Sequence, residues 1–259
     1  MYIRRNLLML LGVILYFGSM LELFSSSDGN LHSLYSITRP QIFNNDFRML
    51  WTWIVAFIFM SVIMLLMHKP TKICGELGLS DKRIIQSVAI GFLFTLPMFI
   101  VNAIFGQFTF SWKAIGVSFM AGICEEIFFR GYLFGQLFRN CRWGFLSASL
   151  ITSLFFGLMH LYQGHDIIST LIAVLVTGAG GILYSWMYVE WNYRLWILIA
   201  LHTFMDVAWM LFPVGEGGYG AAGNMVTNVG RGITIALAIG STVYFKHRKG
   251  KKCFDFKKI

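Results

Sequence analysis

Eight long apolar segments constrain the fold of this chain more than any other feature. They cover residues 7–24, 47–67, 84–105, 112–137, 143–162, 167–188, 193–212 and 229–245. A helix needs about 20 apolar residues to cross the hydrocarbon core of a bilayer. Hydrophobic residues make up 57% of the chain and charged residues 13%, which leaves too little polar surface for a soluble domain. The sequence therefore predicts an all-α, polytopic transmembrane helical bundle of about eight helices, forming a single integral membrane domain over residues 1–259.

Two other membrane classes fit the apolar segments less well. The runs are continuous and lack the alternating pattern of barrel strands, which argues against a transmembrane β-barrel. The first segment follows Arg4 and Arg5, as a signal peptide would, but its apolar run is long and has no clear small-x-small cleavage site. We therefore expect a retained first helix.

The basic residues are distributed unequally between the two sides of the predicted membrane. With eight spans both chain ends lie on one side, and the loops and tail of that side contain Arg4, Arg5, Lys69, Lys72, Lys82, Arg83, Arg139, Arg142, Arg194 and the stretch Lys246–Lys252. The opposite side contains Arg39, Arg48, Lys113 and Arg231. Positively charged loops stay in the cytoplasm, so the sequence predicts an N-in, C-in orientation in a cell membrane. The net charge of +9 then serves topology and anionic lipid, and no nucleic acid is expected as a partner.

The segments 112–137, 143–162 and 193–212 contain a set of ionisable residues. Placing one in hydrocarbon costs about 2.5–3.5 kcal/mol, so such residues indicate function. In chain order they are Glu125, Glu126, Arg130, His160, His202 and Asp206. On an α-helix Glu126 and Arg130 are four residues apart, so they are predicted to form an ion pair with a structural role. Glu125 points about 100° away from Glu126 and must face a histidine, a water or a metal ion.

The remaining residues of this set favour hydrolytic chemistry. His202 and Asp206 are four residues apart and can face one site, to which His160 would add a group from a third helix. A glutamate beside a histidine can deprotonate a water, and a second histidine can donate to the oxyanion of a tetrahedral intermediate. The chain has no G-x-S-x-G or H-E-x-x-H motif, so a serine nucleophile and the common zinc-protease helix are unsupported. The same residues can alternatively join helices by hydrogen bonds and ion pairs.

The order of these residues resembles the motif series of a known family. The blocks are Glu125-Glu126-x-x-x-Arg130-Gly131, then Phe156-x-x-x-His160, then His202-x-x-x-Asp206. This series is similar to that of the CPBP family of CAAX proteases and bacteriocin-processing proteins, also called Abi, which is related to the type II CAAX prenyl endopeptidase Rce1. The resemblance covers a protease-like core at about residues 80–212.

The resemblance implies a glutamic endopeptidase that acts inside the membrane. Glu125 would be the catalytic glutamate, and His160 would be its partner in activating water. His202 would stabilise the oxyanion. The supporting residues would be Glu126 and Arg130, in agreement with their predicted ion pair.

The chain departs from the family pattern at Asp206, where the family often has asparagine. An asparagine amide can donate a hydrogen bond to an oxyanion, whereas an ionised aspartate cannot. Asp206 would then be protonated, orient His202 or bind a metal. No cofactor is expected, although His160, His202, Asp206 and a glutamate would make a reasonable zinc ligand set, so a metal-dependent enzyme stays open.

The predicted function is hydrolysis of a peptide bond in a membrane-associated protein or peptide, in a plasma membrane that is expected to be bacterial. The alternative is a non-catalytic interaction or bacteriocin-immunity protein on the same fold. A proton- or ion-coupled transporter would use the same buried charges, but the chain has no internal repeat of the kind that many transporters contain. The oligomeric state does not follow from the sequence.

Overall fold

The computed structural model describes residues 2–19, 22–25, 31–33, 39–40, 48–215 and 221–253. The chain divides into two compact units. The first consists of Met1–Cys74 with Arg139–Arg142, and the second of Gly75–Phe138 with Trp143–Ile259. All six predicted site residues belong to the second unit. The prediction of one integral membrane domain stays a prediction.

The first unit pairs two apolar helices, α1 (Tyr2–Ser19) and α3 (Arg48–Met67). A short antiparallel hairpin of β1 (Glu22–Ser25) and β2 (Leu31–Ser33) follows α1. The predicted first helix, 7–24, is therefore shifted: it begins earlier, residues 22–24 are in a strand, and residues 20 and 21 lie outside the described residues. Contacts with the Asn140–Arg142 segment extend the helix toward its start, because Arg142 lies 3.9 Å from the centre of the Tyr2 ring and Arg5 donates to the Asn140 side chain.

A 3₁₀ turn (Pro70–Lys72) and α4 (Ile73–Glu76) follow α3 along the chain. The remaining elements are α5 (Ile84–Phe105), α6 (Trp112–Glu125), a π-helix (Glu126–Phe134), α7 (Gly135–Arg139), α8 (Phe145–Leu158), a 3₁₀ turn (Leu161–Gln163), α9 (Ile167–Glu190), α10 (Leu195–Leu211) and α11 (Met225–Arg248). Each of the eight predicted spans corresponds to a helix or to a run of consecutive helices, so the prediction of a polytopic helical bundle is confirmed.

Three of the described helices are long and apolar enough to cross a bilayer, namely Arg48–Met67, Ile84–Phe105 and Ile167–Glu190. The helices α8 and α10 are also apolar but shorter. Of these two, α10 is largely buried, whereas α8 exposes Leu146, Leu150 and Leu154 along one face. The protein is therefore a helical membrane protein whose helices differ in length.

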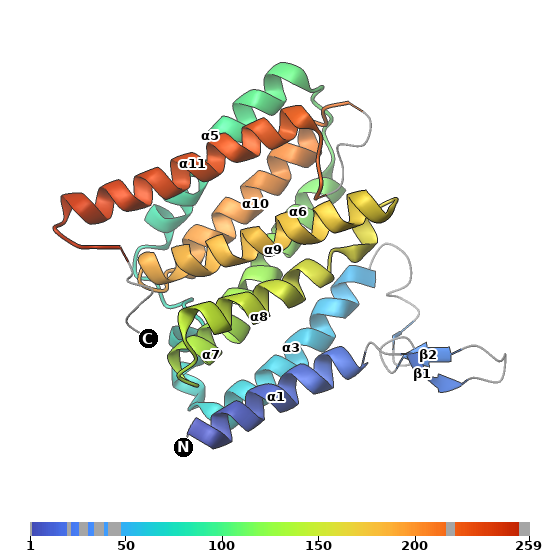
Figure 1. Cartoon of the computed structure of the whole chain (residues 1–259), viewed down its shortest axis with the longest axis vertical. Coiled ribbons are helices and arrows are strands. Elements are labelled where there is room, and N and C mark those ends of the chain that lie inside the picture. Colours follow the sequence, from blue (N-terminus) through green and yellow to red (C-terminus); the bar gives the residue numbers. More distant parts are fainter. Residues whose placement is uncertain are drawn as a thin grey trace. The chain divides into compact units, whose positions relative to one another are not determined.

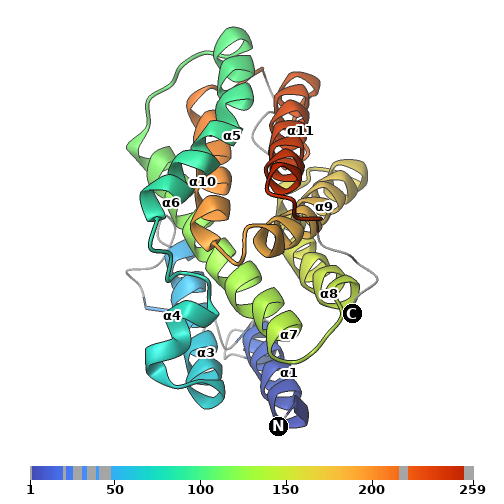
Figure 2. The ribbon, with the colours of Figure 1, turned by 90° about the vertical axis from the view of Figure 1, so that its left-hand side faces the viewer.

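In the second unit α10 is the most deeply packed helix. It contacts both α5 and α6, while α11 packs on α5 and α8 packs on α9 (Figure 1). Seen from the side, α5, α6 and α10 lie on one side of this unit, and α8, α9 and α11 lie on the other (Figure 2). The run Leu195–Leu201 of α10 is almost entirely buried, as expected for a helix that is apolar all round. The ionisable residues of α10 are therefore held among packed helices.

A nine-residue π-helix, Glu126–Phe134, interrupts the helical run between α6 and α7. At its end the N–H of Gly135 donates to the carbonyl oxygen of Arg130, the i to i+5 pattern of a π-helix. The Gln136 side chain donates to the carbonyl oxygen of Gly131 at 3.4 Å. This side-chain bond gives a partner to a backbone carbonyl of the π-helix. The E-E-x-x-x-R-G block thus begins at the junction of an α-helix and a π-helix, and π-helical segments are frequent at functional sites.

Candidate active site

The centre of the candidate site is a buried ion pair on the π-helix. Arg130 Nη1 lies 3.0 Å from Glu126 Oε1, so the predicted pair is present. The Glu126 side chain is fully buried and that of Arg130 is 3% exposed. The Arg130 guanidinium also lies 4.3 Å from the centre of the Phe156 ring and 5.1 Å from that of Tyr184. Two aromatic faces therefore stabilise the cation in addition to the carboxylate.

Glu126 has a second partner that helix spacing alone did not predict. The same Oε1 atom accepts a hydrogen bond from His202 Nδ1 at 2.7 Å. A carboxylate oxygen only accepts, so Nδ1 holds a proton and the orientation of the imidazole is fixed. Glu126 thus links Arg130 of the π-helix to His202 of α10. It is a positioning residue for the histidine as well as half of a neutralised pair.

The other ring nitrogen of His202 faces the two remaining carboxylates. Nε2 lies 3.8 Å from Glu125 Oε2 and 3.6 Å from Asp206 Oδ2. Both separations exceed a hydrogen bond. Among the residues that the structure describes, none forms a hydrogen bond with the buried Oε2 atom of Glu125. Glu125 therefore faces His202, one of the three partners that the sequence allowed for it.

A glycine on α6 brings these groups together. A Cβ atom at Gly122 would lie 2.8 Å from the backbone nitrogen of Thr203 on α10. Only a residue without a side chain permits this approach of the two helices. Because Thr203 directly follows His202 and Gly122 lies one turn before Glu125 and Glu126, the contact sets the distance between histidine and carboxylates.

His160 lies at the edge of the same region. It follows the end of α8 and precedes the 3₁₀ turn Leu161–Gln163. Its Nδ1 lies 2.7 Å from the Phe156 carbonyl oxygen, and its ring packs against the Phe156 ring with centroids 4.8 Å apart. His160 lies within electrostatic range of His202 and Arg130. Within the described part of the chain, however, no hydrogen bond joins His160 to Glu125.

Two residues of the region were not singled out from the sequence. Tyr184 of α9 lies edge-on to His202, with ring centroids 6.0 Å apart. Arg231 of α11 interacts electrostatically with Asp206 and Tyr184, lies 4.4 Å from the centre of the Trp209 ring and donates to the carbonyl oxygen of Ala221. A tyrosine in an apolar run gives no signal, but Arg231 lies near the start of a predicted span and was assigned to a loop. The signal available in the sequence was the position of Arg231 inside the predicted span 229–245.

The metal alternative was tested against the geometry of the site. Over the described ranges, no three His, Cys, Asp or Glu side chains are grouped as metal ligands would be. Glu126 is committed to Arg130 and His202. His160 Nδ1 faces a backbone carbonyl, which leaves its Nε2 atom free to coordinate. The expectation that no cofactor is needed, and the zinc alternative of His160, His202, Asp206 and a glutamate, both stay predictions.

The cysteines lie outside this network of contacts. Cys74, Cys124, Cys141 and Cys253 are free thiols. Cys124 precedes Glu125 and is partly buried. None of the four takes part in a disulfide.

The fold and the site together define a helical membrane protein with a buried cluster of carboxylates, a histidine and an arginine. Residues 107–208 match the family model described as type II CAAX prenyl endopeptidase Rce1-like. This confirms the resemblance over that segment, which contains all six predicted site residues and lies within the predicted core at about 80–212. At the level of the family the match supports a protease of the CAAX type that acts on a membrane-associated substrate. The comparisons with curated proteins and with solved structures gave no match.

Proposed function

We propose that this protein is an intramembrane endopeptidase that hydrolyses a peptide bond with a water activated by Glu125 and His160. The observation that carries the proposal is the environment of His202. Its ring is fixed by Glu126 at 2.7 Å, while its free nitrogen faces Glu125 and Asp206. A fixed donor opposite an uncommitted carboxylate is the arrangement that attack on a carbonyl group requires.

Glu125 acts as the general base in this proposal. Its buried Oε2 atom has no hydrogen-bond partner among the described residues, so it can accept a proton from a water. His160 supports the same water: Nδ1 faces a carbonyl oxygen and must donate, which leaves the Nε2 lone pair of the neutral ring as an acceptor. Two acceptors on one water orient its remaining lone pairs toward the substrate carbonyl carbon.

His202 stabilises the charge that develops on the substrate oxygen. Three carboxylates (Glu125, Glu126 and Asp206) and two guanidinium groups (Arg130 and Arg231) leave one negative charge in this region, which an imidazolium at His202 would balance. In that form Nδ1 donates to Glu126 and Nε2 donates to the oxyanion. Loss of a single such donor typically lowers the rate by about 10²–10³-fold.

The proposed steps balance in atoms and protons. The water oxygen bonds to the carbonyl carbon while Glu125 takes the water proton, and the carbonyl oxygen becomes the oxyanion. When the tetrahedral intermediate collapses, the carbon–nitrogen bond breaks and the proton held by Glu125 passes to the leaving nitrogen. The second water proton stays on the attacking oxygen, so the products are a carboxylic acid and an amine, and the acid then loses that proton to the amine or to solvent.

We also propose an N-in, C-in orientation in the plasma membrane of a bacterium, as the distribution of basic residues predicts. The substrate would be a membrane-associated protein or peptide. A prenylated CAAX peptide is the first candidate because the matching family is described by that activity.

A cleavage assay tests the proposal on purified protein in neutral detergent. The substrate is a quenched fluorescent peptide ending in a farnesylated CAAX sequence, beside the same peptide without the lipid. We expect Glu125→Gln to lower the cleavage rate by about 10²–10⁴-fold, the usual contribution of a general base. Asp166→Asn is the matched control, because it makes the same chemical change at an exposed helix cap and should leave the rate unchanged.

Two results would overturn the mechanism, and a third would overturn the proposed protease function. Equal cleavage by Glu125→Gln and the wild type would exclude Glu125 as the base. Complete loss of activity in a chelator, restored by zinc, would favour metal-dependent hydrolysis. Absence of cleavage with both peptides and with a panel of membrane-protein reporters, in protein whose thermal unfolding is cooperative, would favour the non-catalytic interaction protein.

A further inference from the structure

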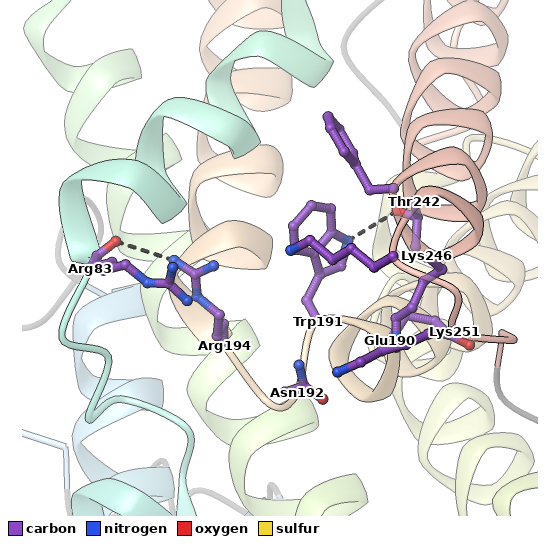
Figure 3. A pocket seen from close by; sticks show the side chains of 10 residues that line it. Arg83, Glu190, Trp191, Asn192, Arg194, Thr242, Lys246 and Lys251 are labelled. Atoms are coloured by element: carbon purple, nitrogen blue, oxygen red, sulfur yellow. Dashed lines mark hydrogen bonds and ion pairs between the residues drawn. The ribbon is translucent and has the colours of Figure 1, made fainter.

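A concave site apart from the candidate active site lies where α5 and α10 begin and where α9 and α11 end. It is a pocket with about 110 Å³ of space for water-sized molecules. Figure 3 shows basic side chains converging on it from separate elements, with Arg83 and Arg194 on one side and Lys246 and Lys251 on the other. Lys249 also lines the pocket. The proposed hydrolysis uses none of these residues.

The end of α11 is shaped so that its lysines gather in one place. Gly250 has a φ angle of +64°, a left-handed conformation that glycine adopts without strain. The N–H of Lys251 then donates back to the carbonyl oxygen of Lys246 at 3.0 Å, and the N–H of Gly250 donates to the carbonyl oxygen of His247. This is the hydrogen-bond pattern of a Schellman helix end. It turns the chain so that Lys251 returns to the pocket beside Lys246.

The opposite wall is a strained turn between α9 and α10. Asn192 and Tyr193 have φ angles of +54° and +60°, which are uncommon for residues with side chains. The turn places Trp191 against α11, where its indole nitrogen donates to Thr242 Oγ1 at 3.0 Å. It also places Arg194 beside Arg83, whose carbonyl oxygen accepts from Arg194 (Figure 3). Strained backbone persists where the surrounding structure enforces it, frequently at binding sites.

The charges of the pocket do not cancel. Arg194 pairs with Asp81 at 2.9 Å, and Lys246 pairs with Glu190 at 3.0 Å. Glu190 is the last residue of α9, yet it is only 2% exposed and lies in this ion pair. Within the described part of the chain, Arg83, Lys249 and Lys251 have no acidic partner in an ion pair. About three positive charges therefore remain around a small pocket, which favours a compact anion.

The position of the pocket favours a membrane lipid as the source of that anion. The pocket lies at the ends of apolar helices, on the side where the sequence places the excess of basic residues, and Trp191 and Phe245 line it. Tryptophan and basic residues are typical of the level of the lipid headgroups. We infer that this pocket binds the phosphate of an anionic phospholipid headgroup, through Arg83, Lys249 and Lys251.

Binding can be measured on the full-length, delipidated protein in a neutral detergent by native mass spectrometry and by thermal shift. The probes are short-chain phosphatidylglycerol, short-chain phosphatidylcholine and inorganic phosphate. We expect phosphatidylglycerol to bind and to stabilise the protein, with an affinity that falls as salt is raised. The zwitterionic lipid and inorganic phosphate should bind at least tenfold more weakly.

A pair of variants locates the site. Lys249→Gln combined with Lys251→Gln should weaken phosphatidylglycerol binding by about 30-fold, since each basic group near an anionic lipid surface contributes about 1 kcal/mol. The matched control is Lys69→Gln combined with Lys72→Gln, which removes the same charge from residues that do not line the pocket. Equal binding by the two double variants would overturn the inference. If inorganic phosphate binds as tightly as phosphatidylglycerol, the anion in the pocket is not specifically a lipid headgroup. This outcome is independent of whether the protein cleaves peptides.

Discussion

Substitution of Arg130 by methionine tests the charge network at the centre of the candidate site. Methionine keeps much of the side-chain volume but leaves the fully buried Glu126 carboxylate with His202 as its one ion-pair partner among the described residues. Breaking a buried ion pair by removing one partner destabilises a protein by about 3–5 kcal/mol. Loss of the contacts with Phe156 and Tyr184 adds to this effect. At about 2–4 °C per kcal/mol for a chain of this size, we expect the melting temperature to fall by about 6–20 °C.

The assay is thermal unfolding in detergent, followed by intrinsic tryptophan fluorescence. Arg248→Met is the matched control, since Arg248 is exposed in the last turn of α11 and its loss should shift the midpoint little. Glu126→Gln combined with Arg130→Met should recover part of the stability, because replacing both charges removes the unpaired carboxylate. An Arg130→Met midpoint equal to that of the control, or additive effects of the two substitutions, would refute the coupling of these residues.

Three further predictions follow from other contacts. Gly122→Ala should lower both the melting temperature and the cleavage rate, because its Cβ would lie 2.8 Å from the Thr203 nitrogen and overpacking costs about 1–3 kcal/mol, whereas Gly116→Ala on the same helix meets nothing within 4 Å and should be neutral or stabilising. Asp206→Asn should retain cleavage within about tenfold while Asp206→Leu loses about 10²–10³-fold, since an amide keeps a polar group opposite His202 Nε2 and leucine does not; equal loss in both would exclude this role. Burial raises the pKa of Asp81, but hydrogen bonds from Ser87 and the Arg83 backbone and the ion pair with Arg194 outweigh it and hold the pKa below 3.8. The stability that Asp81 contributes is therefore present above pH 3.8 and lost as the pH falls through its lower folded-state value, so melting curves of the wild type and Asp81→Asn should differ above pH 5 and converge in acid.

The helices were predictable because length and apolar composition determine a membrane span. The predicted 84–105 agrees with α5 at both ends, and the predicted 47–67 agrees with α3 within one residue. The boundaries failed where a tertiary contact decides them. The Tyr2 ring and Arg5 meet the distant Asn140–Arg142 segment, and no local pattern encodes that contact.

The site was predictable only as a set of residues. The Glu126–Arg130 pair followed from helical spacing, and it survives in the π-helix because one turn still brings the two side chains together at 3.0 Å. The bond from His202 to Glu126 did not follow from spacing. It depends on the approach of α6 and α10 at Gly122 and on the rotation that the π-helix gives to the carboxylates. Neither is encoded in the hydrophobic pattern, since an i to i+5 segment differs from an α-helix by one hydrogen-bond register.

The segment that matches the family does not contain every charge that acts on the site. The match ends at residue 208, but Arg231 of α11 interacts electrostatically with Asp206. Asp206 is the most exposed of the three carboxylates, with 33% of its side chain accessible, and the cations that act on it are His202 and Arg231. If Arg231 balances Asp206, then Arg231→Gln should leave the Glu126–His202 bond intact and change the pH profile of cleavage more than the stability of the protein. A change in melting temperature with an unaltered pH profile would instead assign Arg231 to packing against Trp209.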